Sequence, residues 1–328
     1  MRVLLTGGTG FLGKNVARAL VAAGHELRLL ARGSSDLSGL PQAAEVARGD
    51  VTDADSLRHA AAGCGAICHM AALVKMWVPD RERFDAVNVS GLRNALAAAE
   101  SAGARLVYTS SFMAIGPAGP EPADEARRHP RTRYNNDYER TKALADDLAL
   151  EAAAAGRDVV MLYPGVVYGP GDLTDGNLVV KMVADHLKGR FPGIVGPGDR
   201  LWSYAYVEDV AAGHVAALER GGSGQRYFLC GDNVDMNRLF ALVHEVTGVA
   251  PPRVHIPYTV ADLLGRGLWL WAELTGRPPL LTPGVVGVFR EHWAYSSAKA
   301  ERELGYRPLP LKDGLGRTVG WLKEQGLA

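Results

Sequence analysis

The sequence has little cysteine and no pair of clusters that would bind a metal. Three cysteines in 328 residues, Cys64, Cys68 and Cys230, are too few for a disulfide framework. The N-terminal run MRVLLTGGTG is broken by glycines after a few apolar residues, so it does not read as a targeting segment. We therefore expect a reducing, cytoplasmic setting. Cys64 and Cys68 lack a matching second ligand pair, so no metal site is expected.

The sequence also lacks an excess of either charge, and it lacks long apolar runs. The 36 Lys and Arg residues balance the 36 Asp and Glu residues, so no overall field would recruit nucleic acid or an anionic membrane. The most apolar region, residues 260–289, contains no uncharged run of the roughly 18 residues that a membrane span needs. It is interrupted by Asp262, Arg266, Glu273 and Arg277. We expect no nucleic-acid partner and no membrane span, and any anionic ligand must be held by a local site.

What the sequence does contain is an alternation of strands and helices. In the first 165 residues, short β-branched or Leu-rich runs alternate with Ala-rich helical stretches, a pattern typical of a parallel sheet covered on both faces. After Tyr163 the alternation gives way to Pro- and Gly-rich stretches around helices expected near residues 235–247 and 258–274. The predicted strands are residues 2–6, 26–31, 45–48, 66–69, 105–109 and 158–163.

Two predicted helices have apolar faces. In the first, within residues 84–99, apolar side chains recur at near-helical spacing, and in the second the same holds for Leu144, Leu148 and residues 152–155. Packing against their own sheet is enough to explain both faces. Pairing with the same helices of a second copy, as a homodimer, is the alternative.

A glycine loop, TGGTGFLG, joins the first predicted strand to the first predicted helix. Gly7, Gly10 and Gly13 have the spacing at which a tight turn lets a pyrophosphate approach bare backbone, while amide groups at the helix start hold its charge. Phe11 and Leu12 lie between the last two glycines. This context predicts dinucleotide binding and an α/β fold: a Rossmann-type doubly wound parallel sheet with a smaller C-terminal α/β substrate lobe. We expect the nucleotide domain at 1–165, with segment 203–230 returning to it, and the substrate lobe at 166–328.

The end of the second strand indicates which dinucleotide is bound. An NAD site would present a carboxylate there to the ribose hydroxyls, but this chain has Ala31 followed by Arg32. A guanidinium can bind a 2′-phosphate, and Ser34 and Ser35 can donate to it, so the sequence predicts NADP. Asp36 stands nearby, which leaves NAD open.

A tyrosine and a lysine four residues apart, Tyr138 and Lys142 in DYERTK, form a candidate proton-transfer pair. A phenol near pKa 10 is a poor acid or base at neutral pH, but a lysine one helical turn away would stabilise the phenolate and lower its pKa. The spacing occurs a second time, at Tyr295 and Lys299. Spacing alone does not distinguish the two pairs.

Several segments together resemble the extended short-chain dehydrogenase/reductase family, and they occur in that family's order. They are the glycine loop, Gly49-Asp50-Val51, His69-Met70-Ala71-Ala72, Asn88-Val89-Ser90-Gly91, Tyr108-Thr109-Ser110-Ser111, the YERTK stretch, Tyr163-Pro164-Gly165 and residues 297–308. The resemblance spans most of the chain. Because the 297–308 stretch looks like the family's C-terminal segment, it places Tyr295 and Lys299 away from the nucleotide half.

The resemblance implies roles for individual residues. Tyr138 would be the acid/base, Lys142 would also bind the nicotinamide ribose, and Ser111 would hydrogen-bond the substrate oxygen. Further residues would contact the cofactor: Asp50 and Val51 at the adenine, Ala71 in the channel, Tyr163 and Val166 at the nicotinamide. His69 is expected to be a hydrogen-bonded histidine at a strand end, and Asn88 to brace its helix against the sheet.

The substrate half distinguishes the subfamilies. Nucleotide-sugar epimerases and dehydratases usually place an arginine for the diphosphate where this chain has Trp202, although Arg200 could replace it. Five aromatic residues suggest a largely apolar pocket instead, although aromatic residues in helices are more often part of the core. They are Trp202, Trp269, Trp271, Phe289 and Trp293.

Together with Arg32, this apolar lobe resembles the dihydroflavonol-reductase and 3β-hydroxysteroid-dehydrogenase branch. The resemblance implies NADP(H)-dependent reduction of a ketone or aldehyde of a small molecule, or the reverse oxidation. A sugar epimerase or dehydratase using the same Tyr-Lys-Ser set is the second reading. A redox-sensing protein that binds the nucleotide without turnover is the third.

Overall fold

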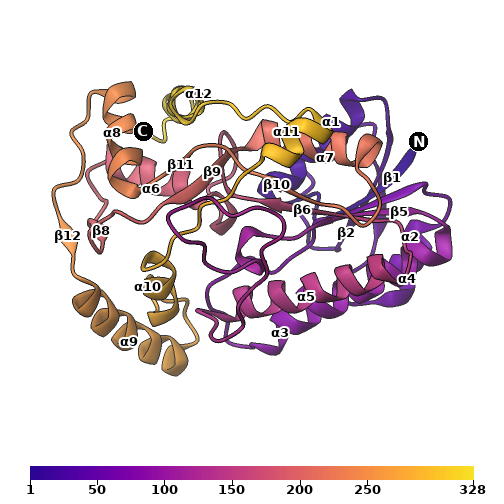
Figure 1. Ribbon diagram of the computed structural model, residues 1–328, viewed down its shortest axis with the longest axis horizontal. Coiled ribbons are helices and arrows are strands. Elements are labelled where there is room, and N and C mark those ends of the chain that lie inside the picture. The colour runs from indigo at the N-terminus through magenta and orange to yellow at the C-terminus, as the bar shows by residue number, and fades with distance from the viewer.

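The computed structural model describes residues 1–328 and is built around a sheet of seven parallel strands (Figure 1). The order across the sheet is β10-β6-β5-β4-β1-β2-β3, which confirms the predicted doubly wound fold. Five predicted strands coincide with observed ones, and β6 lies one residue later than predicted. The strands are β1 (Arg2–Thr6), β2 (Glu26–Ala31), β3 (Glu45–Arg48), β4 (Ala66–His69), β5 (Arg105–Thr109), β6 (Val159–Pro164) and β10 (Arg226–Leu229).

Helices cover both faces of this sheet because its strands are apolar on both sides. On one face lie α1 (Phe11–Ala22), α7 (Val207–Arg220) and α11 (Ala298–Leu304), which form one buried cluster with Val3 and Leu5 of β1. On the other face lie α2 (Ala54–Ala61), α4 (Gly91–Ala102) and α5 (Asp137–Ala154), clustered around Leu4. Alternate residues of one strand thus pack against opposite layers.

One helical segment changes its hydrogen-bond pattern next to the site. The chain passes from α3 (Glu82–Phe84) through a π-helix at residues 85–90 into α4. Local π-helical turns are frequent at functional sites, and here the turn carries Asn88. Helix α5 (Asp137–Ala154) begins after Asn136, which is its N-cap and whose side chain accepts from the Glu139 amide.

The C-terminal half is built from short strands and separate helices. A three-stranded sheet contains β7 (Val166–Tyr168), β9 (Trp202–Tyr206) and β11 (Asn233–Val234), and β8 (Ile194–Val195) pairs with β12 (His255–Ile256). The chain returns to the main sheet at β10. The remaining helices are α6 (Leu178–Leu187), α8 (Met236–Thr247), α9 (Tyr258–Thr275), α10 (Pro283–Phe289) and α12 (Leu311–Glu324). None of the helices combines the length and apolarity that crossing a membrane would require.

Candidate active site

A cleft of about 1010 Å³ lies at the carboxyl ends of the central strands and extends into the C-terminal half. Ligands of open parallel sheets bind at this edge. Of the predicted site residues, all but Tyr163 line the cleft. Those that do are Gly7, Gly10, Phe11, Leu12, Gly13, Arg32, Ser35, Asp50, Val51, Ala71, Ser111, Tyr138, Lys142 and Val166.

The glycine loop is packed so tightly that side chains are excluded at two of its positions. A Cβ on Gly13 would lie 2.0 Å from the carbonyl oxygen of Gly7, and one on Gly7, whose φ is +74°, would lie 2.7 Å from the Ala71 amide nitrogen. Gly10 differs, because a Cβ there would meet only the Gly7 oxygen, at 3.4 Å. Gly7 and Gly13 therefore hold the turn, while Gly10 leaves its outer side open.

The start of α1 fits an anionic ligand. Its N-cap is Gly10, which offers no side-chain cap, and the first turn holds no acidic residue. The first backbone amides of the helix are thus available to a pyrophosphate, with the helix dipole favouring its charge. The loop is fixed from below by Thr6, whose hydroxyl oxygen accepts from the Met70 and Ala71 amides and lies 3.0 Å from Nδ1 of His69. Burial lowers the pKa of His69 to about 3, so this ring stays neutral.

Arg32 stands at the cleft edge with no carboxylate partner. Its side chain is exposed, and its carbonyl oxygen accepts from Arg48 Nη1 at 2.8 Å and from the Ser35 amide. Asp36 does not compete for this position, because its carboxylate is bound to the amide and hydroxyl of Ser38, which lower its pKa. A cation free of internal pairing therefore lies at the predicted 2′-phosphate position.

Asp50 and Val51 line the cleft at the end of β3. The carboxylate of Asp50 accepts from the amide and hydroxyl of Thr52, both at 2.9 Å, and the carbonyl of Val51 accepts from Asn94 on α4. Ser56 Oγ accepts from the Asp50 amide. These bonds fix a short turn whose edge faces the cleft, as a site for a planar base requires.

The DYERTK stretch fixes its own helix turn through the residues between Tyr138 and Lys142. Arg140 binds Asp85 through two hydrogen bonds, and Glu139, fully buried, bonds the Asn135 amide and lies 3.0 Å from His129. Thr141 accepts from Asn88, whose own oxygen accepts from the Leu73 amide. Asn88 thus braces the 73 loop and α5 rather than the sheet.

Tyr138, Lys142 and Ser111 all line the cleft and are each almost completely buried. Burial raises the pKa of Tyr138 above its usual value of 10, and its hydrogen bond with Ser111 opposes this only partly. The expected lowering of this pKa by Lys142 is not found. Lys142 Nζ instead donates to the Thr109 carbonyl at 2.9 Å and to the Tyr108 hydroxyl at 3.1 Å. Ser111 also caps the short helix at residues 112–114 through the Met113 amide.

Burial has the opposite effect on the lysine. It lowers the pKa of Lys142 from 10.5 to about 7, and the negative charge of Asp146 raises it in part. Lys142 therefore lies near the point at which it gains or loses its charge at neutral pH. A phenol that keeps its proton and a lysine that titrates near neutrality are suited to proton transfer.

Tyr163 is placed differently from the other predicted residues. It is fully buried, its hydroxyl donates to Asp146 and accepts from Arg226 Nε at 3.0 Å, and Pro164 lines the cleft in its place. The buried group of Asp146, Arg226 and Tyr163 was missed from the sequence. Asp146 lies one helical turn beyond Lys142, a spacing that would have indicated it; the strand partner Arg226 has no such local signal.

The second Tyr-Lys pair, Tyr295 and Lys299, lies outside the cleft. Tyr295 is fully buried and donates to the Gly116 carbonyl at 2.7 Å, while Lys299 is bound to Gln225 at the surface. Neither residue lines the cleft. The pair therefore has a structural role.

The substrate half of the cleft has an aromatic wall. The rings of Trp202 and Phe289 stack with centroids 5.0 Å apart, and Val285 and Val288 of α10 line the same region. The other three predicted aromatics lie elsewhere: Trp293 is buried and donates to the Val288 carbonyl, and Trp269 and Trp271 point outward from α9. For these three the expectation of pocket residues is wrong: α9 turns its small residues inward and leaves Trp269 and Trp271 outside, and Trp293 belongs to the core.

The arginine that could bind a diphosphate is turned away. Arg200 Nη1 lies 2.9 Å from His292 Nε2, its Nε lies 3.5 Å from Asp199, and it does not line the cleft. Besides Arg32 and Lys142, two cations line the cleft, Lys75 and Arg83, and Lys75 is paired with Asp175 at 2.8 Å. Arg83, like Arg32, makes no ion pair.

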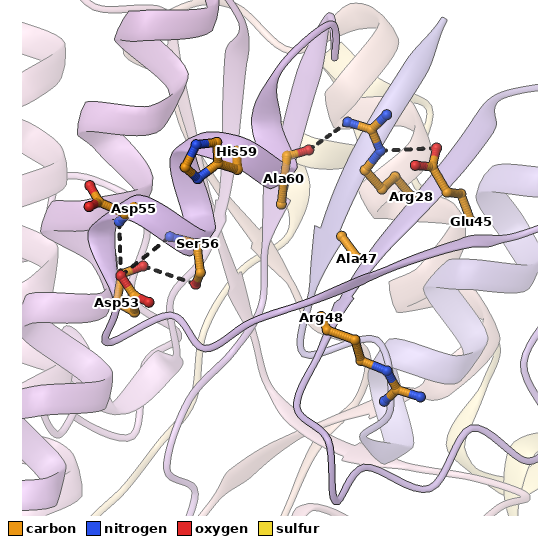
Figure 2. Close-up of a pocket in the computed structure, with 9 residues that line it drawn as sticks. All are labelled: Arg28, Glu45, Ala47, Arg48, Asp53, Asp55, Ser56, His59 and Ala60. Atoms are coloured by element: carbon orange, nitrogen blue, oxygen red, sulfur yellow. Dashed lines mark hydrogen bonds and ion pairs between the residues drawn. The ribbon is translucent and has the colours of Figure 1, made fainter.

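A second hollow, of about 490 Å³, lies between β2, β3 and α2 (Figure 2). Several of its charged groups already have partners: Arg28 pairs with Glu45 at 3.0 Å and donates to the Ala60 carbonyl, and Asp53 caps α2. It contains none of the predicted catalytic residues. We therefore place the active site in the larger cleft.

The chain is similar to several known proteins. The sequence profile of the NAD dependent epimerase/dehydratase family matches residues 3–230. A Synechocystis sp. protein provisionally named dihydroflavonol 4-reductase is 34% identical, with 98% of this chain and 94% of that protein covered. A 3 beta-hydroxysteroid dehydrogenase/Delta 5-->4-isomerase of Mycobacterium tuberculosis is 33% identical, with 94% of this chain and 86% of that protein covered. The crystal structure of gox2253 superposes with a TM-score of 0.85 at 34% identity, covering 99% of this chain and 98% of that one.

Proposed function

Because the chain belongs to the NAD-dependent epimerase/dehydratase family and is thereby an NAD(P)-dependent oxidoreductase of the extended short-chain type, we propose that it reduces a ketone or aldehyde of a largely apolar small molecule with NADPH, or oxidises the corresponding alcohol. One observation carries the proposal. The cleft that contains Tyr138 continues into a wall formed by the Trp202–Phe289 stack, where a diphosphate-binding arginine would stand in a sugar enzyme.

The proposed chemistry follows from which groups in the cleft carry a proton at neutral pH. When bound, the nicotinamide supplies or accepts a hydride. In reduction, the carbonyl carbon gains that hydride and the carbonyl oxygen takes the proton of Tyr138, which the raised pKa keeps on the phenol at neutral pH. Ser111 would donate to the same oxygen, and Lys142 would return a proton to the phenolate. Oxidation runs through the same groups in reverse.

The preference for NADP rests on Arg32. Its guanidinium has no carboxylate partner, so it can bind a 2′-phosphate without first breaking an ion pair. Ser35 lines the cleft beside it. The names of the two relatives, a dihydroflavonol reductase and a 3β-hydroxysteroid dehydrogenase, favour a fused-ring or similarly apolar substrate.

The test is to follow NADPH oxidation with a panel of apolar ketones and aldehydes in the wild type and in Tyr138→Phe. Losing the proton donor should lower kcat by about 10²- to 10⁴-fold, while NADPH binding persists. Tyr295→Phe is the matched control, because it removes a buried phenol outside the cleft and should leave kcat within a few-fold. Full activity of Tyr138→Phe would contradict the assignment.

The alternative of a nucleotide-sugar epimerase or dehydratase is favoured by the unpaired Arg83 in the cleft. The same panel separates the readings, because an epimerase converts its substrate with no net loss of NADPH. A sensing protein would bind NADPH and show no turnover with any compound.

A further inference from the structure

Helix α9 has its large apolar side chains on the outside of the molecule. Leu263, Leu270 and Leu274 are 73%, 56% and 78% exposed. Their spacing of seven and four residues places them on one side of the helix. Figure 1 shows α9 at the outer edge of the molecule, beside α10 and far from the central sheet. With their neighbours they form what we call the outer face of α9: Val260, Leu263, Leu264, Leu270, Trp271 and Leu274.

The inner side of the same helix carries small residues. Ala261, Gly265 and Ala272 are its buried residues, and a Cβ on Gly265 would lie 3.0 Å from the Thr282 carbonyl carbon. The helix therefore approaches the backbone before α10 closely. This is the reverse of a surface helix of a water-exposed domain, which turns its large apolar residues toward the core. A contiguous apolar face of this kind marks an interaction surface.

The charges around the outer face are cationic in excess. The acidic residues of α9 are engaged within the chain: Asp262 with Arg266 at 3.0 Å, and Glu273 with Arg81 at 2.7 Å and the Trp77 ring nitrogen. Arg277, directly after α9, makes no ion pair. Residues 253–291 hold four arginines against three carboxylates, a net charge of +1. Three of these arginines, Arg253, Arg277 and Arg290, make no ion pair, whereas Glu291 is the one carboxylate of the stretch without such a partner.

We propose that the outer face of α9 docks on the surface of an anionic phospholipid bilayer, with the helix lying in the plane of the interface. An apolar stripe flanked by arginines and tryptophans fits that surface, where acyl chains take the leucines and headgroup phosphates take the cations. Trp269 and Trp271, partly exposed, suit the boundary between the two regions.

A second copy of the chain fits this face less well. The guanidinium of Arg290 lies over the Tyr258 ring at the start of α9, and Arg277 follows its end. A two-fold dimer through α9 would set Arg277 against Arg290 if the helices ran antiparallel, and against Arg277 if they ran parallel. Like charges meet in both cases, with no free carboxylate of α9 to separate them. The dimer face expected from the sequence, on α4 and α5, is a different surface.

The cleft lies on the other side of the α9–α10 pair. Val285, Val288 and Phe289 of α10 line it, and the 70–76 stretch that also lines it leads to Trp77 and Arg81, both bound to Glu273 of α9. Docking through α9 would thus hold the cleft close to the bilayer, from which an apolar compound can enter with little exposure to water. The docking itself does not depend on the proposed reaction.

The experiment is sedimentation of the full chain with vesicles of phosphatidylcholine and phosphatidylglycerol in equal parts, and with vesicles of phosphatidylcholine alone. We expect binding to the mixed vesicles that weakens with salt. Leu270→Gln/Leu274→Gln should bind at least about tenfold more weakly, and Arg277→Gln about fivefold more weakly at low salt. Val249→Gln, an exposed valine after α8, is the matched control and should bind as the wild type does.

Three results would overturn the proposal: no binding of the wild type to the mixed vesicles at low salt, equal binding of the double variant, or a wild-type dimer that the double variant converts to a monomer. Because both leucines are exposed, the variant should fold, which its unfolding transition and its turnover of a water-soluble carbonyl compound will show. Vesicle binding is measured without turnover, so its failure is distinct from failure of the proposed reaction.

Discussion

At the scale of single residues, the positions of Tyr138 and Lys142 depend on the three residues between them, which hold the helix turn in place. Glu139 bonds the Asn135 amide, and Arg140 and Thr141 bond Asp85 and Asn88 of the π-helix at residues 85–90. With those three fixed, the backbone turn that carries Tyr138 and Lys142 cannot rotate to relieve the burial of either group. The cost of burying a lysine is therefore held in place at the site, which is how a shifted pKa persists.

Arg32 carries the first prediction at this scale. Arg32→Ala should raise KM for NADPH by about ten- to hundredfold, because it removes a charge-assisted contact to the 2′-phosphate. KM for NADH should change little. Steady-state kinetics with both nucleotides measures this, and Arg302→Ala, an exposed arginine on α11, is the control. An unchanged ratio of the two KM values would contradict NADP selection by Arg32.

The second prediction at this scale concerns Lys142 and the dependence of the free energy of unfolding on pH. Its pKa is lowered from 10.5 to about 7 in the folded state, so between these values the unfolded chain binds one proton more than the folded chain. The free energy of unfolding should therefore rise from pH 7 toward pH 9 by more in the wild type than in Lys142→Met. Urea unfolding at several pH values measures the difference. Parallel curves for the two proteins would show that Lys142 is charged when folded.

At the scale of elements, the strand–loop–helix unit β1-loop-α1 is defined by close backbone contact rather than by side chains. Gly13 packs against Gly7 and Gly8, and Gly8 approaches Leu29 of β2, so the loop is tied to α1 and to the sheet at once. A unit of this kind tolerates no added atom on its inner side.

Gly13→Ala should abolish measurable binding of NADPH, since the new Cβ would overlap the Gly7 carbonyl oxygen at 2.0 Å. The backbone must move away, which disrupts the start of α1. Gly320→Ala on α12 has open space around it and should bind NADPH as the wild type does. Titration of NADPH fluorescence measures both, and tight binding by Gly13→Ala would show that the loop does not hold the pyrophosphate.

At the scale of the whole molecule, the two halves are joined across the cleft by polar contacts. Lys14 of α1 pairs with Asp172 at 2.9 Å, and Trp77 and Arg81 bind Glu273 of α9. A ligand bound between the halves adds contacts to both. NADPH at 100 times its Kd should add about 2.7 kcal/mol to the free energy of unfolding.

Urea unfolding with and without NADPH measures that gain, which should appear as a shift of one cooperative transition. The same concentration of NADH should give a smaller shift if the 2′-phosphate is bound. Absence of any shift with NADPH would contradict binding of the nucleotide to the folded chain.

The sequence by itself determined six of the seven strands of the main sheet and the glycine loop. These are local signals, namely apolar runs of strand length and glycines where side chains cannot fit. The Tyr-Lys-Ser set was indicated by the resemblance to a family, because spacing alone left two Tyr-Lys pairs open. The sequence also placed α8 and α9 within two residues of their observed ends.

Only the tertiary structure decided which way side chains face and what they meet. Trp202 and Trp269 look alike in the sequence, yet one lines the cleft and the other points outward, because β9 and α9 pack against different neighbours. Likewise Tyr163 faces Asp146 and Arg226, which lies 63 residues away in the chain. Burial and long-range pairing are properties of the packed chain, and burial is the main cause of both the raised pKa of Tyr138 and the lowered pKa of Lys142.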